Sequence, residues 1–185
     1  MNTDLVKHKA KEIVTLLTPF CERITIAGSV RRDHINQESD IEILCIPKEV
    51  IISEDIFSIS PDTKFVNEFA ETIKVLAIYN KIKKGNPYFG KYICIDTHIN
   101  RAVNKIQIDI FTCNKENWGY ILAIRTGSAK FSKSLADRWV SKGFVGYEGN
   151  LYKKEGLKRN KINIYEEIDL FNLLNLLYIE PNRRY

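Results

Sequence analysis

The chain has 185 residues, of which 44% are hydrophobic, with 28 Lys and Arg against 23 Asp and Glu and a net charge of +5. This hydrophobic share is enough for a packed core and excludes wholesale disorder, and the length allows one domain or two small, tightly joined ones. No apolar run approaches the ~18 residues that a membrane span needs, and the first residues lack the features of a signal peptide. We therefore expect a soluble intracellular protein, cytoplasmic or associated with a nucleoid.

The four cysteines, at positions 21, 45, 94 and 113, form no Cys-x-x-Cys pair, and each lies in or beside an apolar segment. This pattern favours reduced, buried thiols over a zinc site or a disulfide.

The first half of the chain alternates helical and strand patterns. An amphipathic helix is predicted over 3–18, where Thr3 or Asp4 can cap it and Pro19 marks its end. Further along, the patterns predict strands at 23–27 and 41–46, a helix at 62–79, a turn at 83–87, and a hairpin of strands 88–96 and 105–113 around a polar loop at 97–104.

The composition shifts after Cys113. Helices are predicted at 117–124 and 132–142, a short strand pair at 147–153, a basic stretch at 153–161 and a last helix at 165–177. We therefore expect an α+β fold in two parts: a mixed sheet with helices over 1–113 and a smaller α+β piece over 114–185.

The segment from residue 28 to 44 carries the strongest functional pattern. Gly28-Ser29 is a small-residue turn in which backbone N–H groups and the Ser29 hydroxyl can bind phosphate, and Arg31 and Arg32 offer guanidinium forks for phosphate oxygens. Asp40 and Glu42 then stand two apart on a predicted strand, so their carboxylates share one face.

A third acid, Asp109, lies between Ile108 and Ile110 on a later predicted strand. Three acids that converge at one end of a sheet would repel each other unless divalent cations neutralise them. Mg²⁺ prefers such oxygen ligands, and a two-metal site holds its ions ~3.5–4 Å apart. Asp-x-Glu alone is common on solvent-facing strands, and Gly-Ser alone is a weak signal, so the hypothesis of a catalytic site depends on their order along the chain.

In that order the motifs resemble the DNA polymerase X family of polymerase-beta-type nucleotidyltransferases. The Gly-Ser turn, the Arg pair and the acid-x-acid strand match the family motif, and Asp109 matches its third acid. Thr126-Gly127-Ser128 is similar to the start of the family's thumb subdomain, and the tail from Tyr165 through Glu180-Pro181 resembles its closing helix and end. The likeness covers essentially the whole chain and implies a catalytic palm over 1–113 and a nucleotide- and DNA-binding thumb over 114–185.

The resemblance also implies roles for individual residues. The catalytic and metal-binding acids would be Asp40, Glu42 and Asp109, holding two Mg²⁺ ions that Mn²⁺ can replace. Nucleotide binding would fall to Gly28, Ser29, Arg32, Ser39, Arg125, Gly127 and Ser128. Lys133 would lie near the base pair or its backbone.

Three features depart from the family pattern. Glu42 stands where the polymerases usually have Asp, and Ile124-Arg125 replaces an aromatic pair that helps to exclude ribonucleotides, so Arg125 becomes a candidate contact of the sugar or triphosphate. No counterpart of the usual N-terminal lyase domain precedes the palm-like segment. This minimal form resembles polymerases that some large DNA viruses carry.

The basic residues near the end of the thumb are candidate DNA contacts, because neutralising phosphates releases counterions. They are Lys153, Lys154, Lys158 and Arg159, followed by Lys161. A solvated basic loop is the alternative interpretation of such a run.

The leading hypothesis is a monomeric, Mg²⁺-dependent DNA polymerase that adds dNTPs to a DNA 3′ end in gap filling or repair. A second hypothesis keeps the chemistry but transfers the nucleotide, without a template, to RNA, a protein or a small molecule. A third hypothesis is a non-catalytic DNA-end-binding module with a degenerate site, which Glu42 motivates.

Overall fold

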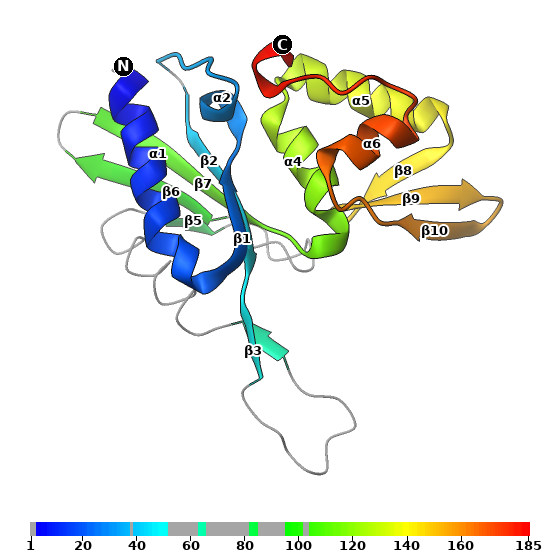
Figure 1. Ribbon diagram of the computed structural model, residues 1–185, viewed down its shortest axis with the longest axis horizontal. Coiled ribbons are helices and arrows are strands. Elements are labelled where there is room, and N and C mark those ends of the chain that lie inside the picture. Colours follow the sequence, from blue (N-terminus) through cyan, green and yellow to red (C-terminus); the bar gives the residue numbers. More distant parts are fainter. Residues whose placement is uncertain (1–2, 38, 52–62, 66–81, 85–94, 102–103) are drawn as a thin grey trace.

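The computed structural model describes residues 3–37, 39–51, 63–65, 82–84, 95–101 and 104–185. Two halves lie side by side in Figure 1: the long helix α1 and a large sheet form one, and α4, α5, α6 and a small sheet form the other. This arrangement agrees with the α+β class predicted from the sequence.

The large sheet is mixed and has the strand order β1-β2-β7-β6-β5. Its strands are β1 (Cys21–Ile26), β2 (Ile41–Pro47), β7 (Asn104–Thr112), β6 (Ile95–Arg101) and β5 (Ile82–Lys84). Strands β2 and β7 pair in parallel, and the other neighbours pair antiparallel. A separate antiparallel pair joins β3 (Glu49–Ile51) to β4 (Thr63–Phe65).

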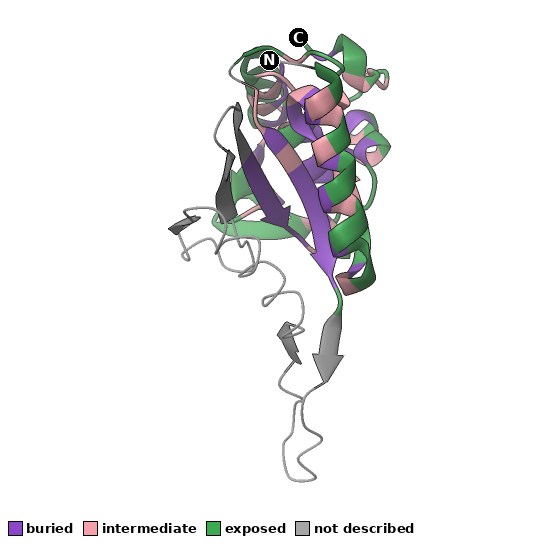
Figure 2. Cartoon of the chain, turned by 90° about the vertical axis from the view of Figure 1, so that its left-hand side faces the viewer, coloured by how far each residue is buried: buried purple, intermediate pink, exposed green. Residues whose placement is uncertain are grey.

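Helix α1 (Thr3–Leu17) covers one face of this sheet, and the 3₁₀ turn η1 (Thr18–Phe20) leads from it into β1. Its buried residues recur at helical spacing, and Figure 2 shows the outer side of the helix exposed and the strands beneath it buried. The core on this side joins Val6, Ala10, Ile13 and Leu17 to Ile41, Ile43, Ile108 and Ile110.

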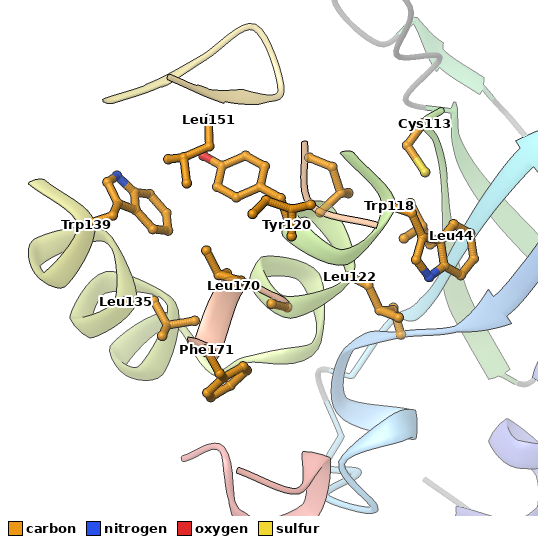
Figure 3. Close-up of a cluster of buried hydrophobic side chains, with 14 of the residues drawn as sticks. Leu44, Cys113, Trp118, Tyr120, Leu122, Leu135, Trp139, Leu151, Leu170 and Phe171 are labelled. Atoms are coloured by element: carbon orange, nitrogen blue, oxygen red, sulfur yellow. The ribbon is translucent and has the colours of Figure 1, made fainter. Parts of the chain in front are cut away.

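The opposite face of the sheet packs against the second half of the molecule. That half contains η2 (Lys115–Asn117), α4 (Trp118–Thr126), α5 (Ala129–Ser141), β8 (Phe144–Tyr147), β9 (Asn150–Glu155), β10 (Lys158–Ile162), α6 (Glu167–Leu173) and η3 (Pro181–Arg183). Leu44 and Phe111 from the sheet share one core with Trp118, Leu122 and Leu170 from the helices, as Figure 3 shows for four of them. This core therefore extends across position 113, where the sequence predicts a boundary.

Several predicted elements differ from the structure. Residues 97–101, predicted as a polar loop, belong to β6, which stays in antiparallel register with β7 as far as Arg101. Residues 83–84 belong to β5 rather than to a turn, and the basic stretch is largely the hairpin of β9 and β10. The last helix ends at Leu173, where Asn175 turns left-handed with φ 55°.

Several predictions fall partly outside the described residues, among them residues 85–87 of the predicted turn and 88–94 of the predicted strand. Most of the predicted helix at 62–79 lies outside them, and its described residues 63–65 form β4. Cys94 also lies outside them, whereas Cys21, Cys45 and Cys113 are free and buried, as predicted. None of the helices among the described residues has the length and apolar composition that crossing a bilayer requires.

Gly119 lets the segment before α6 cross α4 at close range. The Gly119 N–H donates to the Ile164 carbonyl at 2.9 Å, and a Cβ at this position would overlap the Glu166 carbonyl and lie 2.8 Å from its Cα. Backbone cannot rotate away as a side-chain tip can, so the crossing has no room for a methyl group.

We therefore expect Gly119→Ala to lower the free energy of unfolding by about 1–3 kcal/mol, the usual cost of overpacking. Urea denaturation followed by tryptophan fluorescence measures this change. Lys130→Ala, at an exposed position of α5, is the control and should change the free energy by less than about 0.5 kcal/mol. Equal stability of Gly119→Ala and wild type would show that the crossing is looser than described.

Candidate functional site

A single helical turn, α2 (Gly28–Arg31), follows β1 directly and begins the candidate site. Gly28 has φ 60°, the left-handed region that glycine adopts at low cost. A Cβ at Gly28 would overlap the Glu42 carboxylate and lie 2.9 Å from its Cδ. The glycine therefore makes room for an acidic side chain of β2, and its predicted role in phosphate binding stays a prediction.

The parallel pairing of β2 with β7 places Glu42 beside Asp109 in register. Their strand neighbours Ile41, Ile43, Ile108 and Ile110 point into the core beneath α1, so the two acids face the other side, toward the second half of the molecule. Asp40 immediately precedes β2, close enough for its charge to act on Glu42. The structure thus brings Glu42 and Asp109 together on one face, with Asp40 at the strand's start.

Glu42 is in an unfavourable place for a carboxylate. Burial, followed by repulsion from Asp40, raises its pKa from 4.5 to about 7, and attraction from Arg125 and Arg32 offsets only part of this rise. Its side chain is 16% exposed. A further cation near Glu42 would therefore favour its ionised form.

Arg125 at the end of α4 supplies part of the positive charge around these acids. Its guanidinium lies 3.7 Å from the centre of the Phe111 ring, and its Nη1 lies 3.9 Å from Glu42 Oε1. The ring holds the guanidinium by a cation–π interaction, which is strongest where water is partly excluded. Arg125 therefore stands beside the carboxylates. Its contact with the sugar or triphosphate stays a prediction.

The three predicted metal ligands do not form a complete ligand set in this arrangement. Among the residues whose side chains are described, no three His, Cys, Asp or Glu form a group that could hold a metal ion. The Glu42 side chain lies against Gly28 through one oxygen and near Arg125 through the other. The donors nevertheless have the chemistry that Mg²⁺ prefers, hard carboxylate oxygens on adjoining strands.

Two polar atoms beside α2 are buried without a hydrogen-bond partner among the described residues: Ser29 Oγ and Arg32 Nε. Such atoms are costly to bury unless a ligand or water satisfies them. Arg32 is held in place because its Nη1 donates to the Thr126 carbonyl at 2.7 Å. A hydroxyl and a guanidinium N–H without partners among the described residues can both donate hydrogen bonds to a phosphate group.

Arg31 has a different partner from its neighbour, which corrects the expectation that both arginines are available to phosphate. Its two terminal nitrogens donate to the Glu167 carboxylate at 2.9 and 2.7 Å, and Nη1 also donates to Thr126 Oγ1 at 2.6 Å. Both arginines therefore reach Thr126 of the second half, but only Arg31 also pairs with a carboxylate there.

Glu167 and Arg184 complete this ion cluster. Glu167 is 5% exposed and Arg184 is fully buried, and their side chains form an ion pair. Burial raises the pKa of Glu167, but hydrogen bonds from Arg31 and Arg184 outweigh it and bring the pKa below its ordinary value. The Tyr178 hydroxyl also donates to Glu167 at 3.2 Å, so the cluster joins α2, α6 and the tail.

The remaining predicted nucleotide contacts have structural roles of their own. The Ser39 hydroxyl closes a local turn with Asn36, accepting its N–H at 2.9 Å. Ser128 caps α5 by accepting the Phe131 N–H at 3.1 Å, and its own N–H donates to the Arg184 carbonyl. A Cβ at Gly127 would lie 2.6 Å from side-chain atoms of Phe131 and Ser132, so a methyl group there would displace both side chains.

The predicted DNA contacts divide by exposure. Lys133 on α5 and Lys154, Lys158 and Arg159 on the β9–β10 hairpin are exposed. Lys153 instead donates to the Lys142 carbonyl at 2.7 Å and lies 4.4 Å from the centre of the Phe144 ring, which uses its charge within the protein.

Sequence reasoning missed several residues of this region. Glu167 and Arg184 lie in the tail that resembles the family's closing segment. Neither they nor Phe111 were predicted to belong to the site, because their partners lie far away in the chain. Asp96 is the Cα partner of Asp109 across the β6–β7 ladder, so a row of strand positions holds Glu42, Asp109 and Asp96. The register of β6, which the predicted loop concealed, would have revealed this row.

The fold has a counterpart among solved structures. A crystal structure of Leishmania infantum polymerase beta in a ternary P/T complex matches 99% of this chain and 74% of its own, with TM-score 0.67 and 17% sequence identity. The chain matches no family model and no curated protein sequence. The likeness at this identity establishes a polymerase-beta-like fold.

The contact between Gly28 and Glu42 leads to a first prediction for the site. Gly28 and Gly156 both have φ 60°, but a Cβ at Gly156 would meet nothing within 4 Å. Gly156→Ala should cost about 1–2 kcal/mol from the left-handed backbone alone. Gly28→Ala should cost about 1–3 kcal/mol more, because the overlap displaces a buried side chain. Urea denaturation of both variants gives the difference, and equal losses would contradict the contact.

The raised pKa of Glu42 leads to a second prediction. A carboxyl whose pKa rises on folding stabilises the fold below its unfolded pKa, and this stability is lost as pH rises toward the folded pKa. Without metal, wild type should therefore lose stability relative to Glu42→Gln between about pH 4.5 and pH 7, by about 3 kcal/mol at most. Urea denaturation in EDTA at several pH values measures the gap, which a pH-independent difference would contradict.

Proposed function

We propose that the chain is a nucleotidyltransferase that extends a DNA 3′ end by two-metal chemistry, filling short gaps under template direction. The observation that carries this proposal is a pair of buried donors without a partner among the described residues, Ser29 Oγ and Arg32 Nε. They belong to the turn whose Gly28 lies against Glu42, the strand neighbour of Asp109. A phosphate-binding turn beside acids on adjoining strands is the arrangement that phosphoryl transfer needs.

Ser29 and Arg32 hold the β and γ phosphates of the incoming nucleotide in this proposal. The Thr126 carbonyl fixes one end of the Arg32 guanidinium, so its Nε is oriented before the ligand arrives. Preorganised donors stabilise developing charge without a reorganisation cost, so a fixed guanidinium is worth more than a flexible one. Arg125 lies within the same region and contributes charge toward the triphosphate.

Asp40, Glu42 and Asp109 would hold the divalent ions, Mg²⁺ or Mn²⁺. When bound, the ions would lower the pKa of the attacking hydroxyl and neutralise the departing pyrophosphate. The 3′-hydroxyl oxygen forms the new bond to the α-phosphorus, and the bond between the α-phosphorus and the bridging oxygen breaks. The chain's own residues contribute mostly position and charge to this displacement.

The second half of the molecule would bind the sugar and the DNA, as the predicted thumb. Gly127 and Ser128 would lie against the incoming sugar, and Lys133 on the same helix, α5, is exposed for a contact with the duplex. The polymerase-beta-like fold supports this assignment, and the solved neighbour is itself a ternary P/T complex.

We expect Asp109→Ala to lower the rate of primer extension with Mg²⁺ by at least about 100-fold, because the loss of one ligand removes several kcal/mol of charge stabilisation. DNA affinity in EDTA should remain within about 3-fold of wild type, because a phosphate-binding surface elsewhere carries it. Extension of a fluorescent primer on gapped DNA measures the first effect, and fluorescence anisotropy the second.

Asp137→Ala is the matched control, because Asp137 is an exposed acid on α5 away from the site. It should extend primers at the wild-type rate. Unchanged extension by Asp109→Ala would refute the catalytic role of this acid. Testing all eight nucleotides on gapped DNA, single strands and RNA identifies the acceptor, and extension that needs no template would contradict the template-directed part of the proposal.

A further inference from the structure

The sheet of β8, β9 and β10 separates the basic residues of the hairpin onto two faces. Its strand order is β10-β9-β8, and all neighbours pair antiparallel. Residues paired directly across such a ladder point to the same face, and successive residues alternate. The register therefore assigns each strand residue of 144–147, 150–155 and 158–162 to one face or the other.

The inner face packs on the helices. Phe144 and Leu151 are buried in the core, and a Cβ at Gly146 would lie 3.7 Å from Trp139. Lys153 belongs to this face and is the lysine that donates to the Lys142 carbonyl. Lys158 also belongs to the inner face. It lies next to the β9–β10 turn, beyond the last residue of β9 that pairs with β8, and its direct partner is an acid, Glu155.

The outer face has a different composition. Its ladder positions, all within the described stretch 144–162, hold Val145, Tyr147, Asn150, Tyr152, Lys154, Arg159 and Lys161. None of these is Asp or Glu, whereas three are cations, all exposed. The ladder positions of the outer face therefore carry positive charge and no acid, and one acid beside the face, Glu148 in the turn between β8 and β9, hydrogen-bonds Tyr147.

Two of these cations oppose each other directly. Lys154 and Arg159 are Cα partners, and like charges at such positions destabilise a sheet. Lys161 is paired with Tyr152 in the same strand pair, so positive charge continues along the hairpin. An anionic partner that bridges the cations would remove this repulsion.

Aromatic side chains lie among the cations. Tyr147 and Tyr152 are diagonal neighbours across β8 and β9, and Tyr147 is 51% exposed. The Arg159 guanidinium lies 5.7 Å from the centre of the Tyr147 ring, so cation and ring share one surface. Aromatic rings beside a cationic track are the combination that binds unpaired bases and their backbone.

We propose that the outer face of β8–β10 binds single-stranded nucleic acid. This inference rests on the proposed function, in which the bound strand is the unpaired template beyond the duplex. Lys154, Arg159 and Lys161 contact its phosphates, and Tyr147 stacks on a base. Stacking requires an unpaired base, which a duplex does not offer. The face has no large aliphatic side chain for insertion into a membrane.

The test measures binding of a fluorescein-labelled oligothymidylate of about 12 nucleotides, within the usual site size of one such surface. Anisotropy is recorded in EDTA without nucleotide, over a range of salt concentrations. The double variant Lys154→Ala/Arg159→Ala should bind at least about 10-fold more weakly, and its salt slope should fall by about 1.4, or ~0.7 for each lost phosphate contact. Tyr147→Ala should bind about 5-fold more weakly or worse.

Lys11→Ala is the matched control, because it removes the same charge from an exposed position of α1, in the other half of the molecule. It should bind within about 2-fold of wild type at the same salt slope. A loss as large as that of Arg159→Ala alone would overturn the proposal, since net charge would then explain binding. Circular dichroism melting of each variant confirms that the hairpin remains folded.

Three other outcomes would also overturn the proposal: equal weakening of blunt duplex binding, no effect of Tyr147→Ala, and a stronger effect on binding to phosphatidylserine vesicles than on DNA. The outcome is separate from that of the enzymatic proposal. If wild type binds the oligonucleotide with the expected contrast but extends no primer, the surface is supported and the polymerase is refuted. If extension proceeds but the contrast fails, the surface alone is refuted.

Discussion

A buried carboxylate, Glu167, holds the two halves of the molecule together. It accepts hydrogen bonds from Arg31, next to the Ser29–Arg32 turn, and from Arg184 in the tail. A buried charge is tolerable only if it is fully paired, so loss of either arginine would leave an expensive uncompensated ion. The orientation of the second half over the carboxylates depends on this cluster, because Thr126 at the end of α4 also contacts Arg31.

The central sheet has a different task on each face. Beneath α1 its side chains are aliphatic and simply packed, while on the other face they change along the strands from acids at one end to Leu44 and Phe111 at the other. The site is therefore at the border between a core and an open region. Burial there makes the charges of Glu42 and its neighbours interact more strongly than they would in water.

Much of this border could be predicted from the sequence, because strand alternation depends only on local order. Ile41 and Ile43 flank Glu42, and Ile108 and Ile110 flank Asp109, so both acids had to face away from the α1 core. The register that places the two acids side by side depends on how the strands pair, so local order could not predict it. The same holds for the extension of β6 over polar residues, which ladder hydrogen bonds stabilise against local propensity.

Other features could not be predicted because they depend on partners far away in the chain. Arg31 and Arg32 are identical in chemistry, and only the position of Glu167 decides that one is structural. Similarly, Lys153 and Lys154 are adjacent lysines, and only the first donates a hydrogen bond to the Lys142 carbonyl. The pattern of charges in a sequence therefore overestimates the number of charges available to a ligand.

The guanidinium that lies on the Phe111 ring has one more consequence. With Arg125 already 3.9 Å from Glu42, the acidic centre has a resident positive charge before any divalent ion arrives. A divalent ion bound there, as the proposed function requires, would meet carboxylates whose charge Arg125 already offsets in part. Its net electrostatic gain would be smaller than the number of carboxylates suggests.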